Sequence, residues 1–380
     1  MKFKPVAGLT GAIALAFAAS IHCAAASDVK LPDTMIWSAY DVGSGGYTEA
    51  SAIANAVQSK FDTRVRVLPS GTSIGRLLPL QTEKAKFGFL SNETFFAAEG
   101  IYEFSDPNWG PQDLRVVLGR PAAVGIIAAA DVGAKTVADL RGKRVGFVRG
   151  NPSLNIKTDA YLAFGGLARK DVQEIWFGSY GALKDAVLSG HLDAMGMVPT
   201  SSFAREIEAS PRGMTWFNFS PDDEKGWKAA TDVISFAEPV KQTVGAGISS
   251  DKPVWLLGYR YPMLVTYATT TEDEVYNLAK AIDESFELFK DASSEAKNWE
   301  VARSILPPGD APMHDGAIRY AKEKGYWTDA AQAWQDARLK RMAAVKVAWT
   351  DARSAFAKTG RAEGDWPDFW DEFRGQAFAK

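Results

Sequence analysis

Cysteine is almost absent from this chain of 380 residues, and Cys23 is its only example. It lies in an N-terminal segment with Lys2 and Lys4 at the front, an apolar run over residues 6–19 and three alanines at 24–26. This order is typical of a secretory signal peptide, so we expect residues 1–26 to be removed on export. The rest of the chain has no cysteine. This excludes disulfides and thiol catalysis, and it requires a large buried core.

An excess of positive charge is missing as well. Without Lys2 and Lys4, the 43 basic residues fall by two against 46 acidic ones, which leaves a net charge of about −5. Nucleic acid binding needs clustered positive charge, so we expect no nucleic acid partner. The best later apolar run, residues 121–130, is too short to span a bilayer. His191 and His314 lie far apart without ligand spacing, so we expect no metal or other cofactor.

Short apolar runs alternate with helical patterns in two successive blocks. The first block has β-rich runs at residues 35–40, 65–68 and 87–90, separated by helical patterns at 48–60 and 73–84. The second block has runs at 144–148, 173–177 and 194–198, with helices from about residue 155 and at 180–188. Alternation of this kind predicts parallel sheets covered by helices. Two such blocks predict two α/β lobes.

The last part of the chain differs from the rest in amino-acid composition. Residues 328–359 are rich in Ala, Lys, Arg and Gln, and five apolar residues recur there at spacings of three and four: Met342, Val345, Trp349, Ala352 and Phe356. This spacing predicts one apolar stripe along a long helix. A short aromatic tail follows at residues 366–373. We expect the stripe and the tail to pack on the body of the protein, with dimerisation or partner docking as the alternative.

A glycine-rich loop, residues 43–47, follows the first predicted strand. Glycines there let a ligand approach the backbone closely, and N–H groups at the start of the next helix would face an anion. The loop completes neither a nucleotide P-loop nor a dinucleotide-binding pattern. A tight turn without a ligand is the alternative interpretation.

Similar polar segments recur after four further strands, at residues 69–73, 91–92, 149–153 and 199–202. The carboxyl ends of parallel strands meet at one edge of a sheet, where open α/β sheets bind ligands. We therefore predict two polar rims that face each other across a cleft. The predicted ligand-binding residues of these loops are Gly45, Gly46, Tyr47, Ser70, Gly71, Thr72, Asn92, Asn151, Ser153, Pro199 and Thr200.

Four arginines are cationic candidates: Arg76, Arg120, Arg149 and Arg260. A guanidinium at a strand end or helix start can grip a carboxylate through two hydrogen bonds. Arginine is more often found on the protein surface than in a ligand site, and this is the alternative for each of the four. We assign Arg76, Arg149 and Arg260 to the ligand site, and we favour the last two because they adjoin the predicted cleft. A small anionic ligand follows from these cations.

A serine hydrolase is the enzymatic alternative. Gly71-Thr72-Ser73-Ile74-Gly75 spells the pattern of a nucleophile elbow, with Ser73 as the nucleophile and His314 downstream. Two residues separate the preceding strand from this elbow, and the same segment equally starts a helix as a ligand rim. Our main interpretation therefore assigns no catalytic residue.

Taken in this order, the residues resemble the TAXI family, the extracytoplasmic solute receptors of one class of TRAP transporters. The likeness covers roughly residues 34–327. Its more specific pieces are Gly45-Gly46-Tyr47 and the segment from Met313 to Ala317. Residues 138–145 and 190–194 match patterns that are shared widely among bacterial binding proteins.

The resemblance implies a type II periplasmic binding fold, in which the chain crosses twice between two lobes. We place the crossings near Arg120 and Tyr261. The expected division is a signal peptide at 1–26, lobe I at 27–119 and 262–327, lobe II at 120–261, and a C-terminal helical extension at 328–380.

The resemblance also implies a non-enzymatic periplasmic receptor that delivers its solute to TRAP membrane subunits, driven by an ion gradient. Known or inferred ligands of the family include glutamate, related amino acids and dicarboxylates. For this chain we expect a solute of the dicarboxylate, 2-oxo acid or amino acid class. A binding protein of an ATP-driven importer and a sensor of the same fold are alternatives. Arg76 and Ser153-Leu154-Asn155 depart from the family pattern, so glutamate is not carried over to this chain.

Overall fold

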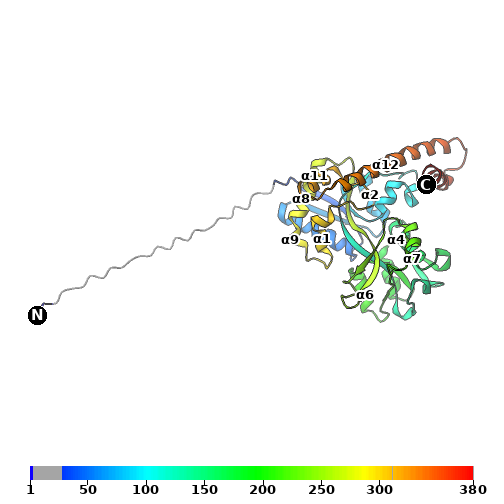
Figure 1. The fold of residues 1–380 in the computed structure, drawn as a ribbon, viewed down its shortest axis with the longest axis horizontal. Helices are drawn as coiled ribbons and strands as arrows, with labels where there is room; N and C mark the ends of the chain where they lie inside the picture. The colour runs from blue at the N-terminus through cyan, green and yellow to red at the C-terminus, as the bar shows by residue number, and fades with distance from the viewer. Residues whose placement is uncertain (3–27, 310, 380) are drawn as a thin grey trace.

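Two α/β lobes lie side by side in a computed structural model that describes residues 1–2, 28–309 and 311–379. Figure 1 shows α1, α8, α9 and α11 around one lobe, and α4, α6 and α7 around the other. The predicted fold class is therefore confirmed. The predicted signal peptide lies almost wholly outside the described residues. Among the residues placed, no helix combines the length and apolar character needed to cross a membrane.

The sheet of the first lobe has three parallel strands in the order β2, β1, β3. Trp37 of the middle strand β1 is fully buried, and every residue of β3 is buried. The strands are β1 (Thr34–Ala39), β2 (Arg64–Pro69) and β3 (Phe87–Leu90). The helices are α1 (Gly45–Phe61), α2 (Ser73–Gln81), α3 (Glu93–Glu99), α8 (Glu272–Glu284), α9 (Phe286–Phe289), α10 (Val301–Ser304) and α11 (Asp315–Glu323).

The second lobe repeats this design, with β5 parallel to both β6 and β7. Helix α4 begins three residues earlier than predicted, because Pro152 occupies its first turn and Asn151 caps it, which suits proline's fixed φ angle. The strands are β5 (Arg144–Val148), β6 (Gln173–Phe177), β7 (Ala194–Met197), β8 (Thr215–Trp216) and β9 (Glu238–Gln242). The helices are α4 (Pro152–Phe164), α5 (Tyr180–Leu188), α6 (Ser202–Ala209) and α7 (Glu224–Val233).

Two long antiparallel strands, β4 (Leu114–Ala128) and β10 (Val254–Tyr267), run through both lobes. One half of β10 pairs with β3, and the other half pairs with β9. The far end of β4 pairs with β7. The ladder between β4 and β10 shifts register between Arg260 and Met263, the region where we placed the crossing from lobe II to lobe I. We keep the names lobe I and lobe II for the ranges given above.

A buried ion pair fixes β4 to helix α1 where the lobes meet. Arg120 donates from Nε and Nη2 to the two carboxylate oxygens of Glu49, over 2.6 and 2.8 Å. Trp299 donates to the same carboxylate over 2.8 Å. Burial opposes the charged form of Arg120, but Glu49 outweighs it, so the pKa of Arg120 is raised. This arginine is committed to the structure, not to a ligand.

The segment after residue 327 forms α12 (Asp329–Phe356) and α13 (Trp366–Ala377), which pack their apolar sides together. The pair lies along lobe I, away from α6 and α7 (Figure 1). Trp366 and Trp370 donate to backbone oxygens of Ser105 and Gly100, each over 2.7 Å. Three arginines surround the buried carboxylate of Glu99. The apolar stripe is therefore covered within the chain.

We expect Arg120→Met to lower the free energy of unfolding by about 3–5 kcal/mol, because Glu49 would remain as a buried charge without its counterion. Urea unfolding followed by tryptophan fluorescence measures this. The control is Lys228→Met, which removes an exposed pair with Asp232 and should cost less than about 1 kcal/mol. Equal losses in both variants would contradict a special role for the pair at the crossing.

Candidate functional site

A small cavity of about 50 Å³ lies between the two lobes, beside the crossing strands. Lobe I and lobe II both contribute side chains, and Val124 of β4 and Tyr261 of β10 complete the lining. Lobe I contributes Tyr40, Asp41, Ser44, Gly71 and Arg76. Lobe II contributes Asn151, Ser153, Leu154, Lys157, Tyr161, Tyr180, Gly196, Met197 and Val198.

The ends of the parallel strands position this lining. Tyr40 and Asp41 follow β1, Gly71 follows β2, Asn151 follows β5, and Val198 follows β7. The carboxyl edges of the two parallel sheets thus face each other, and this is the edge at which open α/β sheets bind ligands. The arrangement agrees with the predicted pair of rims.

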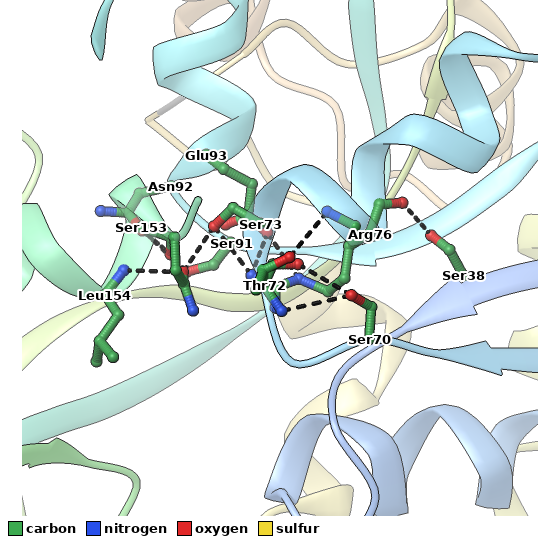
Figure 2. A network of polar contacts seen from close by, with 12 residues as sticks. Ser38, Ser70, Thr72, Ser73, Arg76, Ser91, Asn92, Glu93, Ser153 and Leu154 are labelled. Carbon is green, nitrogen blue, oxygen red and sulfur yellow. Dashed lines mark hydrogen bonds and ion pairs between the residues drawn. The ribbon is translucent and has the colours of Figure 1, made fainter. Parts of the chain in front are cut away.

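Direct hydrogen bonds join the lobes around the cavity. Ser73 donates to Asn151 Oδ1 over 2.7 Å, and Ser153 donates to Asn92 Oδ1 over 2.6 Å. Figure 2 shows Ser153 of lobe II and Asn92 of lobe I turned toward each other. The backbone N–H of Gly181 also donates to Asp41 Oδ2 over 3.0 Å. Because these bonds cross from one lobe to the other, the structure represents a closed arrangement.

Glycine allows the lobes to approach this closely. A Cβ atom on Gly71 would lie 2.7 Å from Cβ of Ser179 in the opposite lobe. A Cβ atom on Gly43, whose φ is +88°, would lie 2.8 Å from the ring of Phe203 in lobe II. Both distances are well below ordinary van der Waals contact. The glycines of these loops therefore serve lobe-to-lobe contact.

The remaining glycines of the first loop, Gly45 and Gly46, were predicted to contact a ligand, but they lie inside helix α1. Gly45 and Gly46 are buried in the first turn of α1, and Ser44 Oγ accepts a hydrogen bond from the backbone N–H of Tyr47 over 3.3 Å. A Cβ atom on Gly46 would lie 2.3 Å from the ring of Tyr40. This loop shapes the cavity by letting Tyr40 pack on α1.

Arg76 of α2 brings a buried cation to the lobe I side of the cavity. Its Nε and Nη2 donate to Glu93 Oε1 over 2.9 and 2.7 Å, and Nη2 also donates to Ser73 over 3.2 Å (Figure 2). Its guanidinium lies 4.2 Å from the ring centre of Tyr40. Burial opposes the charged form, but Glu93 outweighs it and the pKa of Arg76 is raised. Arg76 is a permanent cation in this position.

Lys157 of α4 brings a second buried cation from lobe II. Its side chain is 8 % exposed, and Nζ lies 2.8 Å from Tyr259 Oη and 3.3 Å from Ser153 Oγ. The ammonium also lies 5.6 Å from the ring centre of Tyr261. An ammonium group is costly to bury, so its place in the cavity wall makes this cavity the candidate functional site.

Some polar atoms near the cavity have no hydrogen-bond partner within the part of the chain that the structure describes. They include the hydroxyl of Tyr40, which lines the cavity, and Nδ2 of Asn92. Burial raises the pKa of Tyr40 well above its usual value, so its hydroxyl remains a neutral donor and acceptor. Buried polar atoms are nearly always hydrogen-bonded in proteins, so these atoms call for a ligand or ordered water.

The structure brings four of the predicted ligand-binding residues to the cavity lining: Gly71, Arg76, Asn151 and Ser153. Asn92 lies one contact away, through Ser153. The other predicted residues lie outside the lining: Gly45, Gly46, Tyr47, Ser70, Thr72, Arg149, Pro199, Thr200 and Arg260.

The two favoured arginines are among those outside. Arg149 is exposed, and its guanidinium donates to the backbone oxygen of Trp176 over 3.3 Å. Arg260 lines a separate groove with Glu238 and donates to the backbone oxygen of Gly119 over 3.2 Å. Their position next to the predicted cleft favoured them, whereas the direction of each side chain is set by its neighbours in the fold.

The local caps explain other residues. Thr72 accepts a hydrogen bond from the backbone N–H of Gly75 at the start of α2 over 3.0 Å. The backbone oxygen of Pro199 accepts from Ala246 over 2.9 Å. Each of these groups stabilises its own loop.

Sequence reasoning missed the aromatic and apolar part of the lining and the second cation. The missed residues are Tyr40, Asp41, Ser44, Val124, Leu154, Lys157, Tyr161, Tyr180, Gly196, Met197, Val198 and Tyr261. From sequence alone, a tyrosine at a strand end is expected to be a core residue, and a single lysine in a helix is expected to be exposed to solvent. Tyr40 and Asp41 come directly after β1, and this strand-end position is a local signal that could have found them.

The two residues of the hydrolase alternative have separate partners. Ser73 donates to Asn151 and accepts from Arg76. His314 caps α11: its Nδ1 accepts from Gly316, and its Nε2 lies 2.9 Å from the backbone oxygen of Thr270. Burial lowers the pKa of His314. No cluster of three metal-ligating side chains occurs within the described residues.

The comparisons place the chain in a family. The model of the NMT1-like family matches residues 42–325, which is most of both lobes, so the chain belongs to the NMT1-like family. Its two α/β lobes, joined by two crossing strands, agree with the fold class predicted from the sequence.

Solved structures with low sequence identity align with the chain. The periplasmic aliphatic sulphonate binding protein SsuA from Escherichia coli aligns at 16 % identity and a TM-score of 0.41, over 69 % of this chain and 74 % of its own. A Prochlorococcus marinus protein, PhnD1, in complex with methylphosphonate aligns at 10 % identity and a TM-score of 0.46. The alignment covers 78 % of this chain and 100 % of that protein. An amino acid ABC transporter substrate-binding protein from Streptococcus pneumoniae, bound to L-arginine, aligns at 12 % identity and a TM-score of 0.41. The alignment covers 70 % of this chain and 95 % of that protein.

We expect Gly71→Ala to hold the lobes apart, because the added methyl group would meet Ser179 at 2.7 Å only in the closed form. Small-angle X-ray scattering, with a carboxylate that raises the melting temperature present at saturation, should show a larger radius of gyration than for the unsubstituted protein. The control is Gly178→Ala, where an added Cβ meets no atom within 4 Å. Unchanged scattering in Gly71→Ala would contradict the closed contact.

Proposed function

We propose that this protein is an extracytoplasmic receptor that encloses a small anionic solute between its two lobes. The observation that supports this best is the presence of two buried cations, Arg76 and Lys157, in the lining of one interlobe cavity. One comes from each lobe, so an anion between them contacts both. Hydrogen bonds to charged groups are the stronger ones, and a buried site strengthens them further.

Binding and closure are coupled in this proposal. In the open form the solute meets Arg76 and Tyr40 on lobe I. Closure then brings Lys157, Asn151 and Ser153 of lobe II onto the same solute. Because the closed form makes contacts that the open form lacks, the solute shifts the balance toward closure. A membrane partner can then distinguish the loaded receptor by its shape.

The site is arranged for binding and not for a reaction. The hydroxyl of Ser73 already donates to a neutral amide, Asn151, which cannot act as its general base. The side chain of His314, the other residue of the hydrolase alternative, is occupied at a helix start. We therefore expect the solute to leave the protein chemically unchanged.

We further propose a TRAP-type secondary transporter as the membrane partner and the periplasm as the location. The support is the sequence resemblance carried by Gly45-Gly46-Tyr47 and by residues 313–317. An ATP-driven importer or a sensor is the alternative. Uptake of the labelled solute by cells distinguishes them: an ionophore that collapses the ion gradients should stop TRAP uptake while cellular ATP is still high. Uptake that persists would favour the ATP-driven importer.

We expect Lys157→Met to weaken anion binding by about 30-fold or more, because loss of a buried charged contact costs at least about 2 kcal/mol. Isothermal titration calorimetry with a carboxylate that raises the melting temperature measures this. The matched control is Arg149→Met, which removes an exposed cation outside the cavity and should leave affinity within about twofold. A larger loss of affinity in Arg149→Met than in Lys157→Met would contradict the cavity as the binding site and favour the exposed surface around Arg149.

A further inference from the structure

We infer that the groove lined by Arg260 is a second binding site, separate from the interlobe cavity, for a monocarboxylate with an apolar body. Benzoate represents this chemical class. The inference goes beyond the receptor function, because it concerns a second ligand, and it does not depend on which solute the cavity takes.

The groove lies beside the two crossing strands and has a volume of about 490 Å³. Its lining comes from β4 and β10, from β9 and the preceding Phe236, and from lobe I between residues 295 and 307. No described residue lines both the groove and the cavity. An occupant of the groove would therefore contact both lobes without touching the lining of the cavity.

Arg260 is held on one side of its guanidinium and open on the other. Its Nη1 donates to the backbone oxygen of Gly119 over 3.2 Å and also to that of Arg303. Nε and Nη2 have no hydrogen-bond or ion-pair partner among the residues that the structure describes, and neither is a buried atom. These two nitrogens form the fork that binds both oxygens of one carboxylate. The free fork therefore faces accessible space.

Two other arginines near the crossing show what such a fork holds in this protein. Nε and Nη2 of Arg76 donate to Glu93, and the same atoms of Arg120 donate to Glu49. Burial lowers the pKa of Arg260, whereas in the other two arginines the glutamate outweighs burial. A largely buried cation without a carboxylate is costly. A carboxylate from outside the chain would supply the missing partner.

The acidic residues of the groove favour an occupant with a single negative charge. Glu295 already faces Arg120, with 3.6 Å between Oε2 and Nη1. Glu238 is exposed and stands opposite Gly258 in the ladder between β9 and β10. Gly258 and Arg260 point to the same side of β10, so Glu238 is a diagonal neighbour of the arginine. A second negative charge on the occupant would be repelled there.

Much of the remaining lining is apolar. Four lining residues have apolar side chains that are partly exposed: Pro121, Phe236, Val240 and Pro307. The ring of Phe236 is held by an edge-to-face contact with Tyr259, at 6.2 Å between ring centres. An organic body that covers these side chains removes apolar surface from water, which favours binding. Phosphate or sulfate would leave them uncovered, so a carboxylate on a carbon skeleton fits better.

The first test is isothermal titration calorimetry of the purified protein with benzoate and three relatives. Benzyl alcohol has the same ring without the charge, inorganic phosphate has the charge without the ring, and phthalate adds a second carboxylate. Benzoate should bind at least about tenfold more tightly than each of the three. No detectable binding of benzoate, or equal binding of benzyl alcohol, would overturn the inference.

The second test locates the bound benzoate with three variants. Arg260→Lys keeps the positive charge but loses the fork, so benzoate should bind at least about tenfold more weakly. Glu238→Gln removes the neighbouring negative charge and should tighten binding, a gain that a partly unfolded protein would not show. The control is Lys157→Met, which changes the cavity and should leave benzoate affinity within about twofold.

The pattern across these variants separates the two sites. Benzoate binding that falls in Lys157→Met as much as in Arg260→Lys, or more, would place benzoate in the cavity. That result would overturn the second site and leave the receptor function standing. Unchanged benzoate affinity in Arg260→Lys would also overturn the inference. A loss confined to Arg260→Lys supports the second site, even if the cavity binds no anion and the receptor proposal fails.

Discussion

The antiparallel ladder between β4 and β10 is the constraint on which the site depends. Both strands belong to both lobes, so the two sheets are parts of one hydrogen-bonded array. The register of this ladder shifts between Arg260 and Met263, near the predicted crossing from lobe II to lobe I. The same strands supply Val124 and Tyr261 to the cavity. The hinge therefore both connects the lobes and forms one wall of the site between them.

The two buried cations of this cavity, Arg76 and Lys157, are held in place by neighbouring polar groups. Glu93 holds Arg76 in a fixed position, and hydroxyl groups surround Lys157. Each cation is thus oriented before a solute arrives, so little ordering cost remains at the moment of binding. The hydroxyl of Tyr40 is buried beside the cavity and has no hydrogen-bond partner within the described residues.

The C-terminal extension adds to lobe I without entering the cavity. Trp366 and Trp370 are fully buried between α12, α13 and lobe I, and Glu99 is held by arginines of both helices. Two indole hydrogen bonds to backbone oxygens fix its position. Since its contacts are to lobe I, this lobe is the larger body relative to which lobe II moves in the proposed closure.

The sequence by itself determined the alternation of strands and helices in the core of each lobe. Alternating and apolar runs predicted β5 and β6 at their observed ends, and the spacing from Met342 to Phe356 predicted the stripe of α12. These signals are local, because backbone periodicity and caps depend on neighbours within a few residues. The rule that ligands bind at the carboxyl ends of parallel strands predicted Gly71, Asn151 and Ser153, which line the cavity.

Only the tertiary structure decided which side chains face the cavity. Lys157 is one lysine in a helix, and its burial follows from β10 and from Tyr259, about 100 residues away. Arg149 and Arg260 sit at the predicted places, but their side chains leave the cleft. Gly71 matters because of Ser179 in the other lobe. Contacts between lobes join residues that are distant in sequence, and no local pattern records the direction in which a side chain meets them.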